Sequence, residues 1–79
     1  MKIYVFAKGT GDGSVRLVYT KDKDFFSSIC EAEDYPYDPY EDFGANETPS
    51  VINLPDDFDI DTLGVKVYET AEEYLKEYN

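Results

Sequence analysis

The chain has 79 residues, no His, a single Cys and a formal net charge of −11. One domain spanning 1–79 accounts for this length, and Cys30 alone excludes an internal disulfide, which is typical of a reducing compartment such as the cytoplasm. Without His the chain cannot form a Ser–His or Cys–His catalytic pair, and its negative charge opposes binding to nucleic acid or to an anionic membrane.

The first two predicted elements form a β-hairpin. In the strand predicted for residues 2–8, apolar side chains occupy both alternating faces, which predicts a central strand covered on each side. Gly9–Ser14 follows, with Asp12-Gly13 as the tight turn, and Val15–Thr20 is the return strand. The glycines do not form a phosphate-binding loop, because such a loop opens a helix and this one leads into a strand.

A helix is predicted for Phe25–Glu33, where apolar side chains repeat at i and i+4 and face the sheet. This stripe includes Cys30, which we expect to be a buried, inert thiol. The carboxylate of Asp22 or Asp24 would cap the start of the helix by accepting backbone N–H groups.

The segment between residues 34 and 50 contains three prolines, which forbid a long helix or strand there. One helical turn is expected, with Asp38 as its cap, Pro39 as its first helical residue and Gly44 as its stop. A short strand is predicted at Val51–Leu54.

The C-terminal part is predicted to form a turn, a strand and a helix. Asp56–Leu63 gives a turn or a single helical turn, and Val65–Tyr68 gives the last strand. Thr70 and Glu73 form a capping box that opens the final helix. The buried stripe of this helix consists of Ala71, Tyr74, Leu75 and Tyr78.

These elements predict the order β-β-α-β-β-α and an α+β fold. We expect a small antiparallel sheet of three or four strands with two helices, packed mainly on one face. The sequence leaves open whether the third strand pairs beside the first or the fourth.

The negative charge is concentrated in Asp24–Val65, which carries twelve of the eighteen acids and none of the seven bases. Within it, Tyr35, Tyr37, Tyr40 and Phe43 are interleaved with carboxylates, and Tyr is favoured at protein interfaces. Two interpretations remain open, a binding surface for a basic partner and a solvated acidic face.

Asp57, Asp59 and Asp61 match the first three ligands of a calcium-binding loop. Thr62 and Tyr68 replace the Gly and Glu that such a loop requires, which excludes an EF-hand and leaves a weak surface site as a minor alternative. In an extended chain these three carboxylates would lie about 6.8 Å apart, two strand steps of about 3.4 Å. That is close to the spacing of phosphates along a nucleic-acid strand. We expect no metal and no other cofactor.

We therefore predict a non-enzymatic protein without a small-molecule substrate, whose acidic segment contacts a basic protein. The predicted partner-binding residues are Glu31, Glu33, Asp34, Tyr35, Tyr37, Asp38, Tyr40, Glu41, Asp42, Phe43, Asp56, Asp57, Asp59 and Asp61.

Small size, acidity, the absence of His and the interleaving of carboxylates with Tyr across residues 24–65 resemble the phage-encoded DNA-mimic inhibitors. That group includes several anti-CRISPR proteins and the inhibitors of uracil-DNA glycosylase. The resemblance implies an inhibitor that occupies the nucleic-acid-binding site of a host defence or repair protein, with carboxylates paired to Lys and Arg that normally hold phosphate. The alternative is a non-enzymatic adaptor or antitoxin-like partner of a basic protein.

Overall fold

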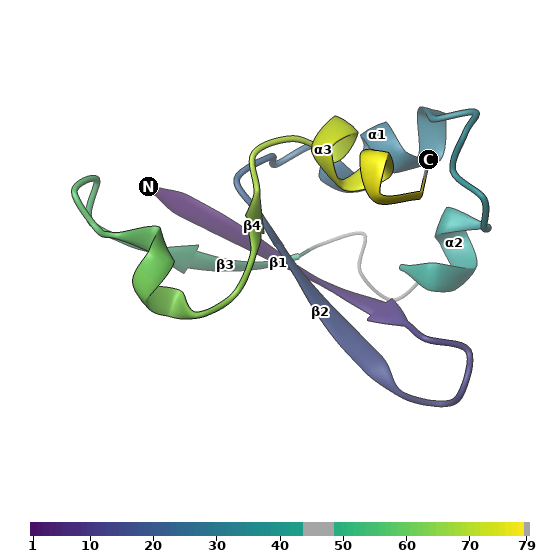
Figure 1. Cartoon of the computed structure of the whole chain (residues 1–79), viewed down its shortest axis with the longest axis horizontal. Helices are drawn as coiled ribbons and strands as arrows, with labels where there is room; N and C mark the ends of the chain where they lie inside the picture. The colour runs from purple at the N-terminus through teal and green to yellow at the C-terminus, as the bar shows by residue number, and fades with distance from the viewer. Residues whose placement is uncertain (44–48, 79) are drawn as a thin grey trace.

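The computed structural model describes residues 1–43 and 49–78, except for the side chain of Tyr78. Gly44, the expected stop of the short helix, lies outside the described residues. The elements, shown in Figure 1, are β1 (Lys2–Gly9), β2 (Val15–Thr20), α1 (Phe25–Glu31), α2 (Pro39–Asp42), β3 (Ser50–Asn53), the 3-10 turn η1 (Ile60–Leu63), β4 (Val67–Tyr68), α3 (Ala71–Leu75) and the 3-10 turn η2 (Lys76–Tyr78). The fold is α+β, as predicted, with α2 as a third helix.

The four strands form one sheet in the order β3-β1-β2-β4. β1 pairs antiparallel with both β2 and β3 and is therefore central, as predicted. β4 runs parallel to β2, so the expectation of an antiparallel sheet is corrected to a mixed one. The cause lies in residues 54–66, which carry the chain from one edge of the sheet back to the other, so that β3 and β4 run in the same direction.

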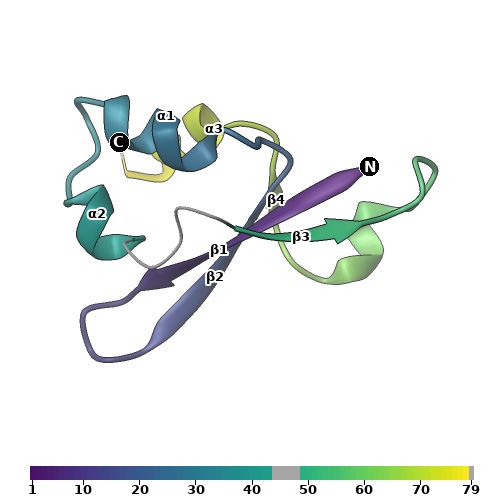
Figure 2. The same cartoon turned by 180° about the vertical axis from the view of Figure 1, so that it is seen from behind.

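The helices cover one face of the sheet, as both views show (Figures 1 and 2). Phe6 and Val18 point to this face and are buried with Phe25 and Ile29 of α1 and Tyr74 of α3. The ring centroids of Phe6 and Phe25 lie 5.1 Å apart, and those of Phe25 and Tyr74 lie 5.2 Å apart. Tilted and edge-to-face ring pairs stabilise a core beyond the area they bury, which matters in a domain this small.

The turn of the hairpin is held by the Asp12 side chain. Its carboxylate accepts hydrogen bonds from the backbone N–H of Ser14, at 2.9 Å, and from the Thr10 hydroxyl. Both bonds favour the ionised form, so they hold the pKa of Asp12 below its usual value. Gly11 and Gly13 have φ angles of 85° and 90°, a backbone conformation that residues with a Cβ atom rarely adopt.

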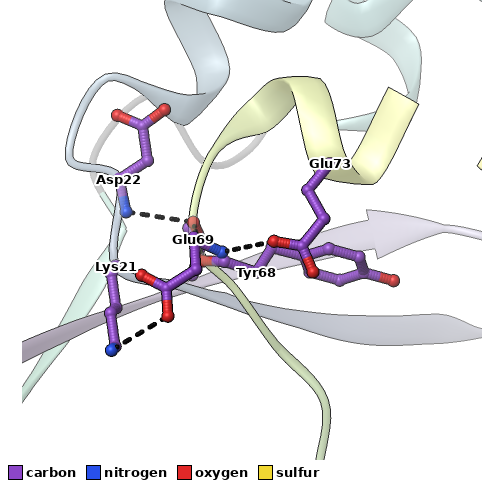
Figure 3. A network of polar contacts seen from close by, with 6 residues as sticks. Lys21, Asp22, Tyr68, Glu69 and Glu73 are labelled. Carbon is purple, nitrogen blue, oxygen red and sulfur yellow. Dashed lines mark hydrogen bonds and ion pairs between the residues drawn. The ribbon is translucent and has the colours of Figure 1, made fainter. Parts of the chain in front are cut away.

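A polar network joins the end of β2 to β4 and α3 (Figure 3). The Thr20 hydroxyl donates to the Tyr68 carbonyl at 2.9 Å and accepts from the backbone N–H of Asp22 at 3.0 Å. Lys21 pairs with Glu69 at 3.0 Å, and the Glu69 N–H donates to Glu73 at 3.0 Å. β4 pairs with β2 through only two residues. The hydrogen bond from the buried Thr20 hydroxyl to Tyr68 and the neighbouring polar contacts therefore help to hold this short strand in place.

Of the two carboxylates predicted to cap α1, only Asp22 accepts a backbone N–H at the start of the helix. Asp24 occupies the N-cap position, but its side chain accepts no capping hydrogen bond. Asp22 accepts instead from the N–H of Asp24 at 2.9 Å and from the N–H of Ala71, at the start of α3, at 3.3 Å. One carboxylate therefore links the beginnings of α1 and α3. The α1 helix also ends at Glu31, because Ala32 is already extended.

Candidate protein-binding interface

Two buried aromatic side chains hold the acidic segment against the core. Tyr35 is 8% exposed and Phe43 is fully buried. The Phe43 ring centroid lies 5.8 Å from that of Phe25, and the Tyr35 hydroxyl donates to Asp42 Oδ2 at 2.5 Å. Both were predicted to contact a partner. Their burial corrects that expectation, because rings enclosed in the core cannot form a binding surface.

Between these two anchors the chain turns outward. Tyr37 is 57% exposed and Tyr40 is 62% exposed. Asp38 caps α2 as predicted, since its Oδ1 accepts the N–H of Tyr40 at 2.9 Å, and Pro39 is the first helical residue. The Tyr40 ring packs edge-on against Phe26 with centroids 5.6 Å apart. Tyr40 is therefore held in place by Phe26 while much of its ring stays exposed.

Exposed carboxylates flank these tyrosines along the chain. They are Glu31, Glu33, Asp34, Asp38 and Glu41, and together with Tyr37 and Tyr40 they make up what we name the acidic lobe. Asp42 is half-buried and accepts the hydrogen bond from the Tyr35 hydroxyl. It therefore supports the acidic lobe from inside.

The acids of residues 56–61 lie far from the acidic lobe. Both views place α2 near one end of the molecule and the loop before η1 near the other, along a longest dimension of 36 Å (Figures 1 and 2). Asp56, Asp57, Asp59 and Asp61 are all exposed. The structure therefore does not join the two predicted groups into one surface.

The helical turn predicted within Asp56–Leu63 is present as η1, so Asp57, Asp59 and Asp61 do not form the row of carboxylates that an extended chain would give. Asp59 caps η1, where its Oδ1 accepts the N–H of Asp61 at 3.1 Å, and Asp61 lies in the first turn of η1. A 3-10 turn does not keep the two-residue period of a strand. Asp56 accepts a hydrogen bond from the amino group of Met1 at 2.8 Å, which lowers the pKa of Asp56.

An open pocket of about 580 Å³ adjoins the acidic lobe and was not predicted from the sequence. Cys30 lines it and is half-buried, which corrects the expectation of a buried thiol. The only signal for the pocket in the sequence is Phe26, which shares the apolar stripe of α1 with Cys30. The other lining residues are Phe6, Lys23, Ser27, Glu31 and Tyr40.

Residues 1–43 and 49–78 lack two kinds of feature. In these ranges no three acidic, Cys or His side chains are placed to hold a metal ion together. Within the same ranges, no helix has the length and apolarity needed to cross a membrane.

Comparison with protein-family models, curated protein sequences and solved structures finds no match to this chain. Function must therefore follow from the chemistry of the site. That chemistry is charge and exposed aromatic area on a supported surface.

Proposed function

We propose that the protein is an inhibitor that occupies the basic nucleic-acid-binding site of a host defence or repair protein. The observation that supports this function best is the acidic lobe, in which five exposed carboxylates flank two exposed tyrosines held between buried anchors. Residues 24–65 contain no base that could neutralise these charges from a neighbouring position in the sequence.

The inhibitor would act by competition and without chemistry. Exposed carboxylates of the acidic lobe pair with Lys and Arg side chains that otherwise bind phosphate, and ion pairs to Arg can be bidentate. Tyr37 and Tyr40 add contact area and can stack on guanidinium planes. The net charge of −11 attracts a basic partner over distance, so association is fast and weakens with added salt.

The buried anchors give the acidic lobe a further advantage. Tyr35 and Phe43 fix the two ends of residues 35–43 in the core, and the Asp38 side chain caps the first turn of α2. A surface that is already ordered loses less conformational entropy on binding than a free loop does. The affinity of the lobe therefore depends on residues that never touch the partner.

The acids of residues 56–61 have a different part in this proposal. They lie at the opposite end of the long axis from the acidic lobe. One compact site on a partner therefore does not contact both groups of acids. Asp57 and Asp61 contribute to long-range attraction, which is screened beyond about 10 Å at moderate ionic strength.

A competition titration tests the proposal. Partners captured at low salt and eluted at high salt are purified and titrated with the protein at low and high ionic strength, with and without their own nucleic acid. We expect nucleic acid and the protein to exclude each other from one site, and the affinity to fall steeply with salt.

Two other outcomes would change the conclusion. If a basic partner binds but nucleic acid never competes, the protein is an adaptor or an antitoxin-like partner. If binding is indifferent to salt, the acidic lobe is a solvated face and the proposed function is wrong.

A further inference from the structure

The outer edge of β2 is only partly covered. β4 pairs with Tyr19 and Thr20 alone, so among the residues that the structure describes no strand lies beside Val15–Val18 on that side. Figure 1 shows the hairpin of β1 and β2 extending beyond the start of β4. Open strand edges are templates for pairing with another chain, and proteins commonly block them with proline, bulges or several charges. β2 contains no proline and only one charged residue, Arg16.

The backbone of this edge is oriented for pairing. Thr10 N–H donates to the Ser14 carbonyl at 3.2 Å across the hairpin, and Lys21 N–H donates to the Tyr68 carbonyl of β4 at 2.9 Å. In a strand, successive residues direct their backbone groups to opposite sides. Odd-numbered residues of β2 therefore face the outer edge, so the N–H and C=O groups of Val15 and Leu17 point toward an incoming strand.

The side chains along the edge differ between the two faces of the sheet. Val15 and Leu17 share one face and are 63% and 51% exposed. Arg16 lies on the other face, is exposed and forms no ion pair with any residue that the structure describes. An incoming strand would thus meet apolar side chains on one face and a positive charge on the other.

A groove of about 300 Å³ follows this edge. Among the residues that the structure describes, its lining includes three bases, Lys8, Arg16 and Lys66, and one acid, Glu77, which pairs with Lys66 at 2.9 Å. This is a positive surface on a protein of net charge −11. Its charge therefore selects a negatively charged occupant, opposite to the occupant of the acidic lobe.

We propose that an extended acidic segment of a partner protein adds to β2 at Val15–Val18 as a further strand of the sheet. Its carboxylates would lie beside Arg16, and its alternate apolar side chains would lie beside Leu17, because cross-strand neighbours share a face. A second copy of this chain fits less well. Antiparallel pairing of two β2 edges puts the two Arg16 side chains directly or diagonally opposite each other, and each copy adds a charge of −11.

The probe is a synthetic peptide of about six residues, the length of an average strand, in which Glu and Val alternate. A peptide of alternating Lys and Val is the matched control. We expect the Glu peptide to slow hydrogen exchange at the amides of Val15 and Leu17, measured by NMR, and the Lys peptide to leave them unchanged. If neither amide is protected, or the Lys peptide protects them equally, the proposal is wrong.

Two variants sharpen the test. Arg16→Glu should weaken peptide binding by about tenfold, the effect of losing one good ion pair and adding repulsion, whereas Lys2→Glu, the same charge change elsewhere on the sheet, should change it by less than about twofold. Leu17→Pro should abolish binding, since it removes an outward N–H. Hydrogen exchange at the β1 amides reports whether the Leu17→Pro variant folds. If it does not fold, the proposal is judged from amide protection in the wild type and from peptide binding by Arg16→Glu.

The oligomeric state of the protein without peptide is the last measurement. If the protein sediments as a dimer without peptide, with Val15 and Leu17 already protected, the edge binds a second copy and the acidic-peptide proposal is overturned. Arg16 lines a pocket with Tyr37 of the acidic lobe, but exchange at the amides of Val15 and Leu17 reports on the β2 edge alone, so this test and the competition titration can fail separately.

Discussion

At the scale of single residues, four aromatic side chains between residues 35 and 43 have two distinct roles. Tyr35 and Phe43 are buried and stabilise the fold, whereas Tyr37 and Tyr40 lie outside between them. The sequence does not distinguish these roles, because all four rings stand among carboxylates and no periodic pattern links them. The packing of Phe43 against Phe6, Phe25 and Tyr74 in the folded chain makes it a core residue.

Phe43→Ala should therefore unfold the protein far more easily than Tyr40→Ala. Loss of a fully buried Phe typically costs about 3–5 kcal/mol, a large share of the stability of a small domain. Tyr40→Ala removes one exposed ring that contacts Phe26 and should cost about 1 kcal/mol. Urea unfolding of both variants measures the difference; equal losses would show that residue 43 is not the anchor described.

Glu77 should make stability depend on pH. The hydrogen bonds that Glu77 receives from Lys66 and Tyr68 lower its pKa below the usual value. A lowered folded-state pKa means that the stabilisation is present above the unfolded-state pKa, about 4.3, and is lost as pH falls through the lower folded-state value.

Glu77→Gln should thus cost about 1 kcal/mol or less at pH 7, because the pair is largely exposed. The cost should shrink as pH falls below about 4. Thermal melts across pH, with Glu72→Gln as an exposed control, provide the measurement. A cost that persists unchanged in acid would mean that the charge of Glu77 is irrelevant.

At the scale of elements, α3 is held mainly by Tyr74. Its ring is 4% exposed and lies 5.1 Å from the Tyr68 ring and 5.2 Å from the Phe25 ring. Leu75 is only half-buried at the margin of the core. Tyr74→Ala should cost about 3–5 kcal/mol and Leu75→Ala about 2 kcal/mol, near the low end for aliphatic truncations. If denaturant unfolding gives the reverse order, α3 docks through its other side.

Local sequence patterns predict where single strands and helices begin, but they do not predict how distant elements pair. Alternation at period two locates Val15–Thr20 correctly, and the Thr-x-x-Glu box locates the start of α3, because both signals are local. The direction of β4 depends on the path of residues 54–66 across the sheet, and a strand of two residues carries no signal of its partner. The same is true of the site, since the distance between the two acidic groups depends on that path.

At the scale of the whole molecule, the charge of −11 should oppose folding through self-repulsion. Raising NaCl from about 0.01 M to about 0.5 M shortens the screening length from about 30 Å to a few Å, and it should raise the melting temperature. CaCl2 and MgCl2 at equal ionic strength should act alike, because the described acids form no metal-holding group. A melting temperature that falls with salt, or a rise specific to calcium, would contradict this prediction.

The acidic lobe near α2 adjoins the basic groove along β2, because Lys8 and Arg16 line a pocket together with Tyr37 and Asp42. The central claim is that the acidic lobe, rather than net charge alone, binds the basic partner. Two triple variants separate these possibilities, since each removes three negative charges from exposed positions. The lobe variant carries Glu33→Gln, Asp34→Asn and Glu41→Gln, and the control carries Asp57→Asn, Asp61→Asn and Glu72→Gln.

Titration of the captured partner with both variants and the wild type at one moderate salt concentration is the most direct measurement. Three surface ion pairs of about 0.5–1 kcal/mol each predict that the lobe variant binds about tenfold to a hundredfold more weakly. The control should bind within about threefold of the wild type, because its charges act only at long range. If the two variants lose affinity equally, or if the lobe variant binds like the wild type, the acidic lobe is not the binding surface.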